Sequence, residues 1–237
     1  MIRIKDTGWK AICQQAGIRI DPYANSTPDR RLFTLEKRRE PMFQVRIHGR
    51  GGQGVVTAAE LLAVAAFREG RHAQAFPSFG SERTGAPVVA FCRLDDRPIR
   101  LREPIMAPDA LIIQDPTLLH QVDVFSGLAP DGYVLINTTR SLDELGLAEF
   151  LGRFRRDRIC TVAATELALK HVGRPVPNAA LLAGFAAISA RISLASVVAA
   201  IRERFPPKVA DANVAAAQEA HDSVMSEMQG VAHAEAG

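Results

Sequence analysis

Two glycine-bearing segments carry the residue types best suited to hold a ligand. The first segment consists of Gly49, Arg50, Gly51, Gly52, Gln53 and Gly54. Its glycines match the pattern G-x-G-x-x-G, and glycine lets a ligand approach the main chain closely. An apolar alternation over residues 43–47 precedes the segment, and a run with helical periodicity follows over residues 55–66. The sequence therefore predicts a strand, a glycine turn and a helix, in that order.

This order of elements is typical of an anion-binding turn. The first N–H groups of the helix are free, and the helix dipole favours a negative charge in front of them. Arg50 adds a permanent cation to the segment. We interpret the segment as a phosphate-binding turn, and the alternative of a tight turn that binds nothing stays open. An NAD fingerprint also needs an acidic residue roughly 20 positions on, at the end of the second strand. The expected second strand, residues 72–76, ends in Pro-Ser-Phe-Gly, which counts against ordinary NAD binding.

The second segment is a polar, glycine-containing loop over residues 77–87, between two apolar runs. Its hydrogen-bonding and charged members include Ser81, Glu82, Arg83 and Thr84, followed by Gly85.

No catalytic or metal-binding set is evident. The six histidines follow no metal spacing, and no G-x-S-x-G elbow occurs. The cysteines at 13, 92 and 160 are far apart and form no ligand pattern. His48 either touches a ligand or is a strand-end histidine bonded to the backbone, and the second interpretation is favoured. Asp115 follows a strand and is interpreted first as a helix N-cap and second as a ligand contact.

The elements that must position these residues alternate between strands and helices. Strands are expected at 43–47, 72–76, 88–92, 98–100, 110–114, 133–137 and 158–163, with 88–92 and 98–100 forming a hairpin. Helices are expected at 55–69, 117–122, 165–172, 177–188, after Ser193 and at 208–229. A further helix is expected behind the capping box formed by Ser141 and Glu144. The pattern predicts an α/β, Rossmann-like, mostly parallel sheet with helices on both faces, and the apolar helix 177–188 is expected to be buried.

The 237-residue chain is long enough for one substantial domain with an appendage. Residues 1–41 form an N-terminal extension, read either as an arm that contacts a partner subunit through Trp9 and Phe33 or as a loosely ordered terminus. Residues 42–237 form the α/β domain with its C-terminal helices. The net charge of +3 is spread out, so nucleic-acid binding is not expected. No apolar run, signal peptide or cysteine framework points to a membrane or to export, so a cytoplasmic location is expected.

Four motifs in order carry a specific resemblance. They are HGRGGQGVVTAAELLAVAAF, QAFPSFGSERTGAPVVAFCRLDDRPIRLR, DPTLL and PNAALLAGFA. Over residues 42–228 the chain resembles the gamma subunit of the 2-oxoacid:ferredoxin oxidoreductases, of the pyruvate and 2-ketoisovalerate type. The resemblance implies alpha, beta and delta-type partner subunits that carry thiamine diphosphate, magnesium and iron–sulfur clusters. Such an assembly converts a 2-oxoacid and coenzyme A to an acyl-CoA, carbon dioxide and two electrons, which ferredoxin or NAD accepts through the partners.

The same resemblance implies that this chain contacts coenzyme A. The expected contacts are residues 49–54 and 81–85, with Arg50 and Arg83 on phosphate oxygens. The N-terminal extension departs from the usual gamma pattern and hints at a phenylglyoxylate dehydrogenase-like variant with an extra electron-transfer subunit. Two other hypotheses stay open: a stand-alone NAD-dependent Rossmann dehydrogenase, and a purely structural subunit whose glycine loop is only a turn.

Overall fold

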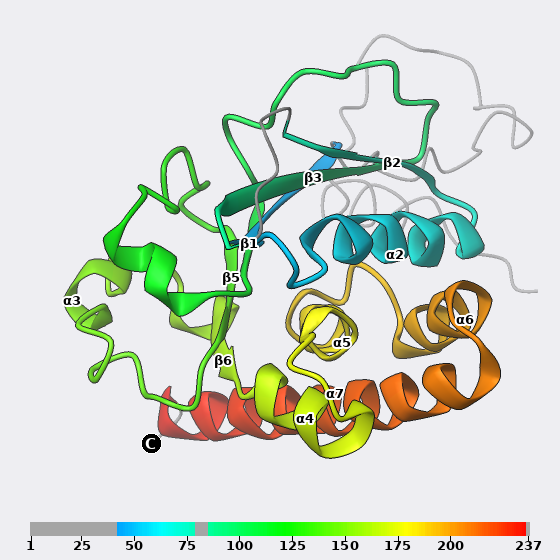
Figure 1. Ribbon diagram of the computed structural model, residues 1–237. Coiled ribbons are helices and arrows are strands. Elements are labelled where there is room, and N and C mark those ends of the chain that lie inside the picture. Colours follow the sequence, from blue (N-terminus) through cyan, green and yellow to red (C-terminus); the bar gives the residue numbers. More distant parts are fainter. Residues whose placement is uncertain (1–41, 79–84, 236–237) are drawn as a thin grey trace, which may run out of the picture. The chain divides into compact units, whose positions relative to one another are not determined.

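The computed structural model describes residues 42–78 and 85–235 (Figure 1). The predictions made for Trp9, Phe33 and residues 81–84 therefore lie outside the described residues. Backbone contacts group residues 40–237 into one compact unit. The boundary between residues 41 and 42 that the sequence suggests stays a prediction.

The centre of this unit is a six-stranded sheet in the order β2-β3-β1-β4-β5-β6. Its strands are β1 (Phe43–Arg50), β2 (His72–Pro77), β3 (Pro87–Asp95), β4 (Ala110–Ile113), β5 (Tyr133–Asn137) and β6 (Ile159–Val162). β1, β4, β5 and β6 run parallel, whereas β3 is antiparallel to both β1 and β2. Three of the five neighbouring pairs are thus parallel, and the prediction of a mostly parallel α/β sheet is confirmed.

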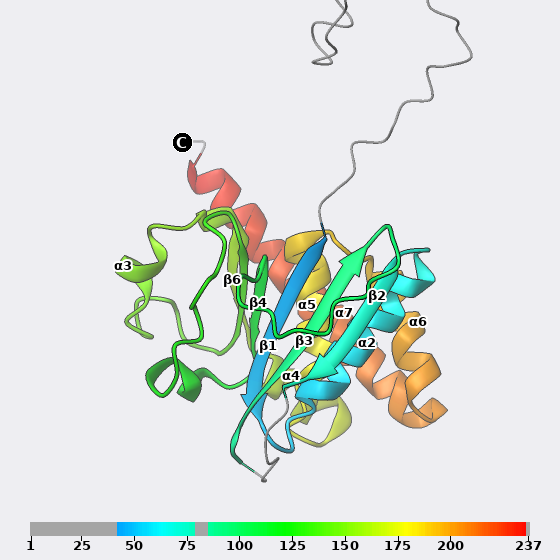
Figure 2. The ribbon, with the colours of Figure 1, turned by 90° about the horizontal axis from the view of Figure 1, so that it is seen from above.

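The two faces of the sheet are covered by different kinds of structure. One face carries α2 (Val55–Arg68), α4 (Ala164–Val172), α5 (Asn178–Ser189), α6 (Leu194–Arg204) and α7 (Pro207–Glu235), which Figure 1 shows stacked on one side. The opposite face, toward the viewer in Figure 2, carries loops, the short 3-10 helix η1 (Pro116–His120) and the one-turn α3 (Ala148–Leu151). A second 3-10 helix, η2 (Arg156–Arg158), leads into β6 and contacts α7. Each face has its own apolar cluster, and the larger one lies under the long helices.

Helix α5 is the centre of the larger cluster. Every residue from Asn178 to Ser189 is buried, which confirms the expectation drawn from its apolar sequence. It contacts α2, α6 and α7 as well as strands β5 and β6, so no face of the helix meets water. A helix enclosed in this way has no need of a polar stripe.

The predicted return strand at residues 98–100 is wrong. β3 already has an antiparallel neighbour on each side, because it pairs with β1 and with β2. The chain after β3 instead crosses the open face as a loop, and two arginines on the strands hold it there. Arg93 donates to the Glu103 carbonyl at 2.6 Å, and Arg46 donates to the Ile105 carbonyl at 3.4 Å. Buried guanidinium groups thus satisfy the carbonyls of a loop where a strand was expected.

The predicted helix behind Ser141 is also wrong, although its capping box forms. The backbone N–H of Ser141 donates to Glu144 at 2.7 Å, and the N–H of Glu144 donates to the Ser141 hydroxyl at 3.2 Å. The following residues close a single turn, since Gly146 adopts a φ of 68°. A left-handed residue ends a helix, so the box closes a turn and α3 begins only at Ala148.

Candidate functional site

The two glycine segments meet at the carboxyl end of β1. The N–H of Gly51 donates to the Ala86 carbonyl at 3.0 Å, and the N–H of Gly85 donates to the Gly51 carbonyl at 3.1 Å. Strand β1 continues through Gly49 and Arg50, so the turn itself is shorter than the sequence suggested. The structure thus joins the first segment to the end of the second, while Ser81, Glu82, Arg83 and Thr84 lie outside the described residues.

Two glycines of the first segment are fixed by their surroundings. Gly54 caps α2 with a φ of 75°, and a Cβ there would lie 2.7 Å from the side-chain nitrogen of Asn178. A Cβ on Gly49 would lie 2.6 Å from a methyl group of Val55. Gly52 differs, because no atom of the described residues lies within 4 Å of its would-be Cβ, and its φ is 97°. Among the described residues the tip of the turn therefore has no close neighbour, while its base is packed against α2 and α5.

Arg50 ties the two segments to the start of η1. Its Nε donates to Asp115 at 3.0 Å, and its Nη1 donates to the Gly85 carbonyl at 3.0 Å. Its Nη2 donates to the Thr117 hydroxyl at 2.7 Å and to the Gln121 side-chain oxygen at 2.9 Å. A guanidinium has five N–H donors. These four bonds leave at most one N–H for a ligand, so Arg50 mainly holds the site together.

Asp115 is the anionic partner in this network and, as predicted, the N-cap of the helix that follows, which is the 3-10 helix η1. It accepts bonds from the N–H and hydroxyl of Thr117 at 2.9 and 2.6 Å and from the Gln53 amide at 3.0 Å. Burial alone would raise the pKa of the Asp115 carboxyl. The bonds from Thr117 and Gln53, with the charge of Arg50, outweigh burial and hold this pKa below its ordinary value. Asp115 therefore stays ionised near neutral pH.

The network lies where the sheet changes direction. β1 leads into α2 on one face, whereas its parallel neighbour β4 leads into η1 on the other face. Open α/β sheets bind ligands outside the carboxyl ends of their strands at such a point. The geometry therefore supports a ligand site at the turn formed by residues 51–54.

Two buried polar side chains line the strand ends beneath this site. The Nε2 atom of His48 and both amide atoms of Gln114 have no hydrogen-bond partner among the described residues. Burial, aided by the nearby charge of Arg46, lowers the pKa of His48 to about 4. His48 is therefore neutral near pH 7 and offers no charge to an anion, and the predicted backbone bond is not made by its Nε2. The sequence does not identify Gln114 as a site residue, because its place at the end of a predicted strand is the only signal it gives.

Residues 42–78 and 85–235 contain no group of three His, Cys, Asp or Glu side chains placed to hold a metal ion. Burial raises the pKa of the Cys160 thiol to about 12 and that of Cys92 higher still, so neither thiol is a ready nucleophile. Within the same ranges, no helix combines the length and the apolar character that a membrane span requires.

Comparisons with known proteins point to one family. The family model described as pyruvate ferredoxin/flavodoxin oxidoreductase matches residues 44–223. Pyruvate synthase subunit PorC of Methanothermobacter marburgensis is 45% identical over 185 residues, covering 77% of this chain and 98% of the relative. The pyruvate/ketoisovalerate oxidoreductases common subunit gamma of Pyrococcus abyssi is 45% identical over 181 residues, covering 76% of this chain and 96% of the relative.

Solved structures agree with these sequence matches. The pyruvate oxidoreductase subunit PORC of Thermotoga maritima superposes with a TM-score of 0.65 at 34% identity, covering 77% of this chain and 97% of that one. The 2-oxoglutarate:ferredoxin oxidoreductase of Magnetococcus marinus, solved with 2-oxoglutarate, coenzyme A and succinyl-CoA, gives a TM-score of 0.61 at 14% identity. It covers 79% of this chain and 32% of that longer chain, and at this identity the likeness shows the fold alone.

Proposed function

The chain belongs to the pyruvate ferredoxin/flavodoxin oxidoreductase family, and from that membership we propose that it is the gamma subunit of a multi-subunit 2-oxoacid oxidoreductase. Support comes from two relatives that are named as subunits, because this chain matches each of them over nearly its whole length. The assembly oxidatively decarboxylates a 2-oxoacid with coenzyme A in the cytoplasm, giving an acyl-CoA, carbon dioxide and two electrons. Alpha, beta and delta-type partners carry thiamine diphosphate, magnesium and iron–sulfur clusters. The phenylglyoxylate-type variant with an extra subunit stays a prediction.

The role proposed for this chain is to receive coenzyme A at the paired glycine turns. The observation that carries this role is the pair of backbone bonds that join Gly51 to Ala86 and Gly85 at the edge where open sheets bind ligands. Coenzyme A carries a pyrophosphate and a 3′-phosphate, which call for N–H groups and cations. The residues present fit this need, because no described residue crowds Gly52 and Gly54 leads directly into the first turn of α2.

The two arginines of the glycine segments have different proposed roles. Arg50 donates most of its N–H groups to Asp115, Thr117, Gln121 and the Gly85 carbonyl, so it fixes the shape of the site. Arg83 of the second segment is the arginine that we expect to meet phosphate oxygens. Thiamine diphosphate, when bound in a partner chain, supplies the carbanion chemistry at the 2-oxoacid. This chain then positions the acyl acceptor.

The stand-alone NAD dehydrogenase is the weaker alternative. An NAD site wants an acidic residue roughly 20 positions beyond the glycines, at the end of the strand that follows the first helix. That strand is β2, and it ends at Pro77 without a carboxylate. Asp115 follows β4, on the other side of β1 from β2, and is already held by Arg50.

The test is to purify the native assembly through a tag on this chain. We expect partner subunits identified by mass, bound thiamine diphosphate, and coenzyme A-dependent oxidation of at least one acid in a panel of 2-oxoacids. A chain that purifies alone and binds NAD tightly would instead support the stand-alone dehydrogenase.

A further inference from the structure

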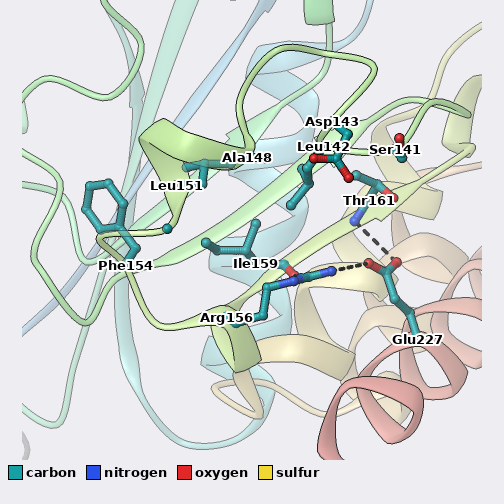
Figure 3. A pocket seen from close by; sticks show the side chains of 11 residues that line it. Ser141, Leu142, Asp143, Ala148, Leu151, Phe154, Arg156, Ile159, Thr161 and Glu227 are labelled. Atoms are coloured by element: carbon teal, nitrogen blue, oxygen red, sulfur yellow. Dashed lines mark hydrogen bonds and ion pairs between the residues drawn. The ribbon is translucent and has the colours of Figure 1, made fainter. Parts of the chain in front are cut away.

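The far edge of the sheet, away from the glycine turns, has a second feature with the marks of a binding site. β6 is the last strand, and its Val162 carbonyl accepts from Thr138 on the β5 side. Ile159 and Thr161 therefore turn their backbone groups outward. Two side chains take the place of a further strand, since Arg156 donates to the Ile159 carbonyl at 2.6 Å and the Thr161 N–H donates to Glu227 at 3.4 Å (Figure 3).

A pocket of about 340 Å³ opens beside this edge. Its size falls within the range of about 300–1,000 Å³ that is usual for ligand pockets. The pocket is lined by apolar groups of Leu142, Ala148, Leu151 and Ile159 and by polar groups of Ser141, Asp143, Arg156, Thr161 and Glu227. Figure 3 shows Arg156 and Glu227 together on one side, with Asp143 and Ser141 across from them. The pocket thus joins an apolar surface to a charged rim.

The carboxylate of Glu227 has capacity to spare. Among the described residues it accepts from the Thr161 N–H at 3.4 Å and from the Thr161 side chain, and the Arg156 guanidinium lies 3.9 Å away. Both distances are long beside the usual N–H···O distance of about 2.9 Å, and a carboxylate has room for about four donors. Burial also raises the pKa of Glu227, with Thr161 and Arg156 only partly opposing it. The Glu227 carboxylate can therefore accept a further hydrogen bond from a donor that enters the pocket.

The charges select the kind of donor. Asp143 and Glu227 line the pocket against one cation, Arg156, and one nitrogen of Arg156 is already committed to the Ile159 carbonyl. A negative excess over an apolar floor suits a positive group on an aliphatic stem, which is the form of a lysine or arginine side chain. An anion would meet two carboxylates there.

We propose that this β6-edge pocket receives a lysine or arginine side chain from a neighbouring subunit, with its stem on Leu142 and Ile159 and its charged head on Glu227. The inference rests on the proposed function in one respect, because it requires that the chain has a neighbouring subunit. The pocket lies at the β6 edge of the sheet, whereas β2 forms the opposite edge, and the glycine turns lie at the end of β1. Coenzyme A binding and this contact are therefore separable.

The test compares how often wild-type and variant chains are incorporated into the assembly. Differently tagged wild-type and variant chains are produced together with the partner subunits, and their ratio in the purified complex is measured by mass spectrometry. We expect Glu227→Gln to enter about tenfold less often than wild type, the loss expected for one charge-assisted hydrogen bond. The matched control is Glu203→Gln on α6, where an exposed glutamate pairs with Arg68 at 2.5 Å, and it should enter equally.

A second variant separates docking from mere capping of the strand edge. Arg156→Gln removes the cation that competes for Glu227, so it should enter at least as well as wild type. If Glu227 and Arg156 only stabilise the edge, both variants will be incorporated less often than wild type to a similar extent. That result would overturn the docking proposal. Equal entry of Glu227→Gln and wild type would overturn it as well. A wild-type chain that enters no assembly at all would instead remove the proposed function, and the docking with it.

Discussion

The guanidinium of Arg50 and the carboxylate of Asp115 form the rigid centre of the site. Their side chains are only 21% and 12% exposed, so water weakens this pair less than a surface pair. The pair connects β1, η1 and the end of the second glycine segment through one ion pair and its neighbouring bonds. Removing one of these charges should therefore weaken the contacts between all three segments.

Replacing Asp115 with asparagine tests this network. Asp115→Asn keeps the shape but removes the charge, and we expect the free energy of unfolding to fall by about 1.5–3 kcal/mol, the range for hydrogen bonds to charged groups. Chemical denaturation measures the change. The control is Asp211→Asn, whose pair with Arg202 is 54% and 64% exposed, and it should cost less than about 1 kcal/mol. Equal losses in the two variants would show that the network carries no special weight.

His48 makes stability depend on pH in a defined window. The unfolded chain protonates this histidine near pH 6.5, whereas the folded chain does so only near pH 4. Between these values the unfolded state binds more protons, so stability falls as pH drops, by about 1.4 kcal/mol per unit. We expect His48→Leu to flatten the curve of unfolding free energy in this window relative to wild type. Parallel curves for wild type and His48→Leu would contradict the assignment.

At the scale of elements, the link from β1 to α2 depends on a glycine that has no substitute. Gly54 combines a φ of 75° with a would-be Cβ 2.7 Å from Asn178, whereas Gly173 has a φ of 74° and open space around it. Both substitutions to alanine incur the left-handed strain of about 1–2 kcal/mol. Gly54→Ala adds a collision with α5 and should lower the melting temperature clearly more than Gly173→Ala. Similar melting temperatures would show that the turn can relax.

Local patterns in the sequence predict elements well where one segment decides its own structure. The apolar run of β5, the buried helix α5 and the Ser193 cap of α6 are all confirmed. Patterns fail where distant segments decide. β3 pairs with β1 and β2, so the expected partner at 98–100 is not needed. The missed helix behind Ser141 has a local cause instead, because Gly146, five residues on, adopts a left-handed φ of 68°.

The candidate site shows the same division. Its glycine turn can be predicted from spacing, because glycines, strand and helix are contiguous in the chain. The role of Arg50 could not be predicted, since its partners Asp115 and Gln121 lie 65 and 71 residues away. The buried amide of Gln114 likewise gains its meaning only when β4 is placed beside β1.

At the scale of the whole molecule, the fold presents two separate candidate binding surfaces. The carboxyl ends of β1 and β4 carry the paired glycine turns, and the outer edge of β6 carries the pocket closed by Arg156 and Glu227. Under the proposed function, the first surface meets coenzyme A. Under the further inference, the second surface meets a neighbouring subunit.

The most direct test of the central claim is steady-state kinetics of the purified assembly carrying Arg83→Ala in this chain. The account predicts that KM for coenzyme A rises about tenfold, the loss expected for one charge-assisted phosphate contact, while KM for the 2-oxoacid stays the same. Arg97→Ala, at an exposed arginine beyond the far end of β3, serves as the control and should leave both constants unchanged. An unaltered KM for coenzyme A in Arg83→Ala would contradict the claim that the glycine turns of this chain receive coenzyme A.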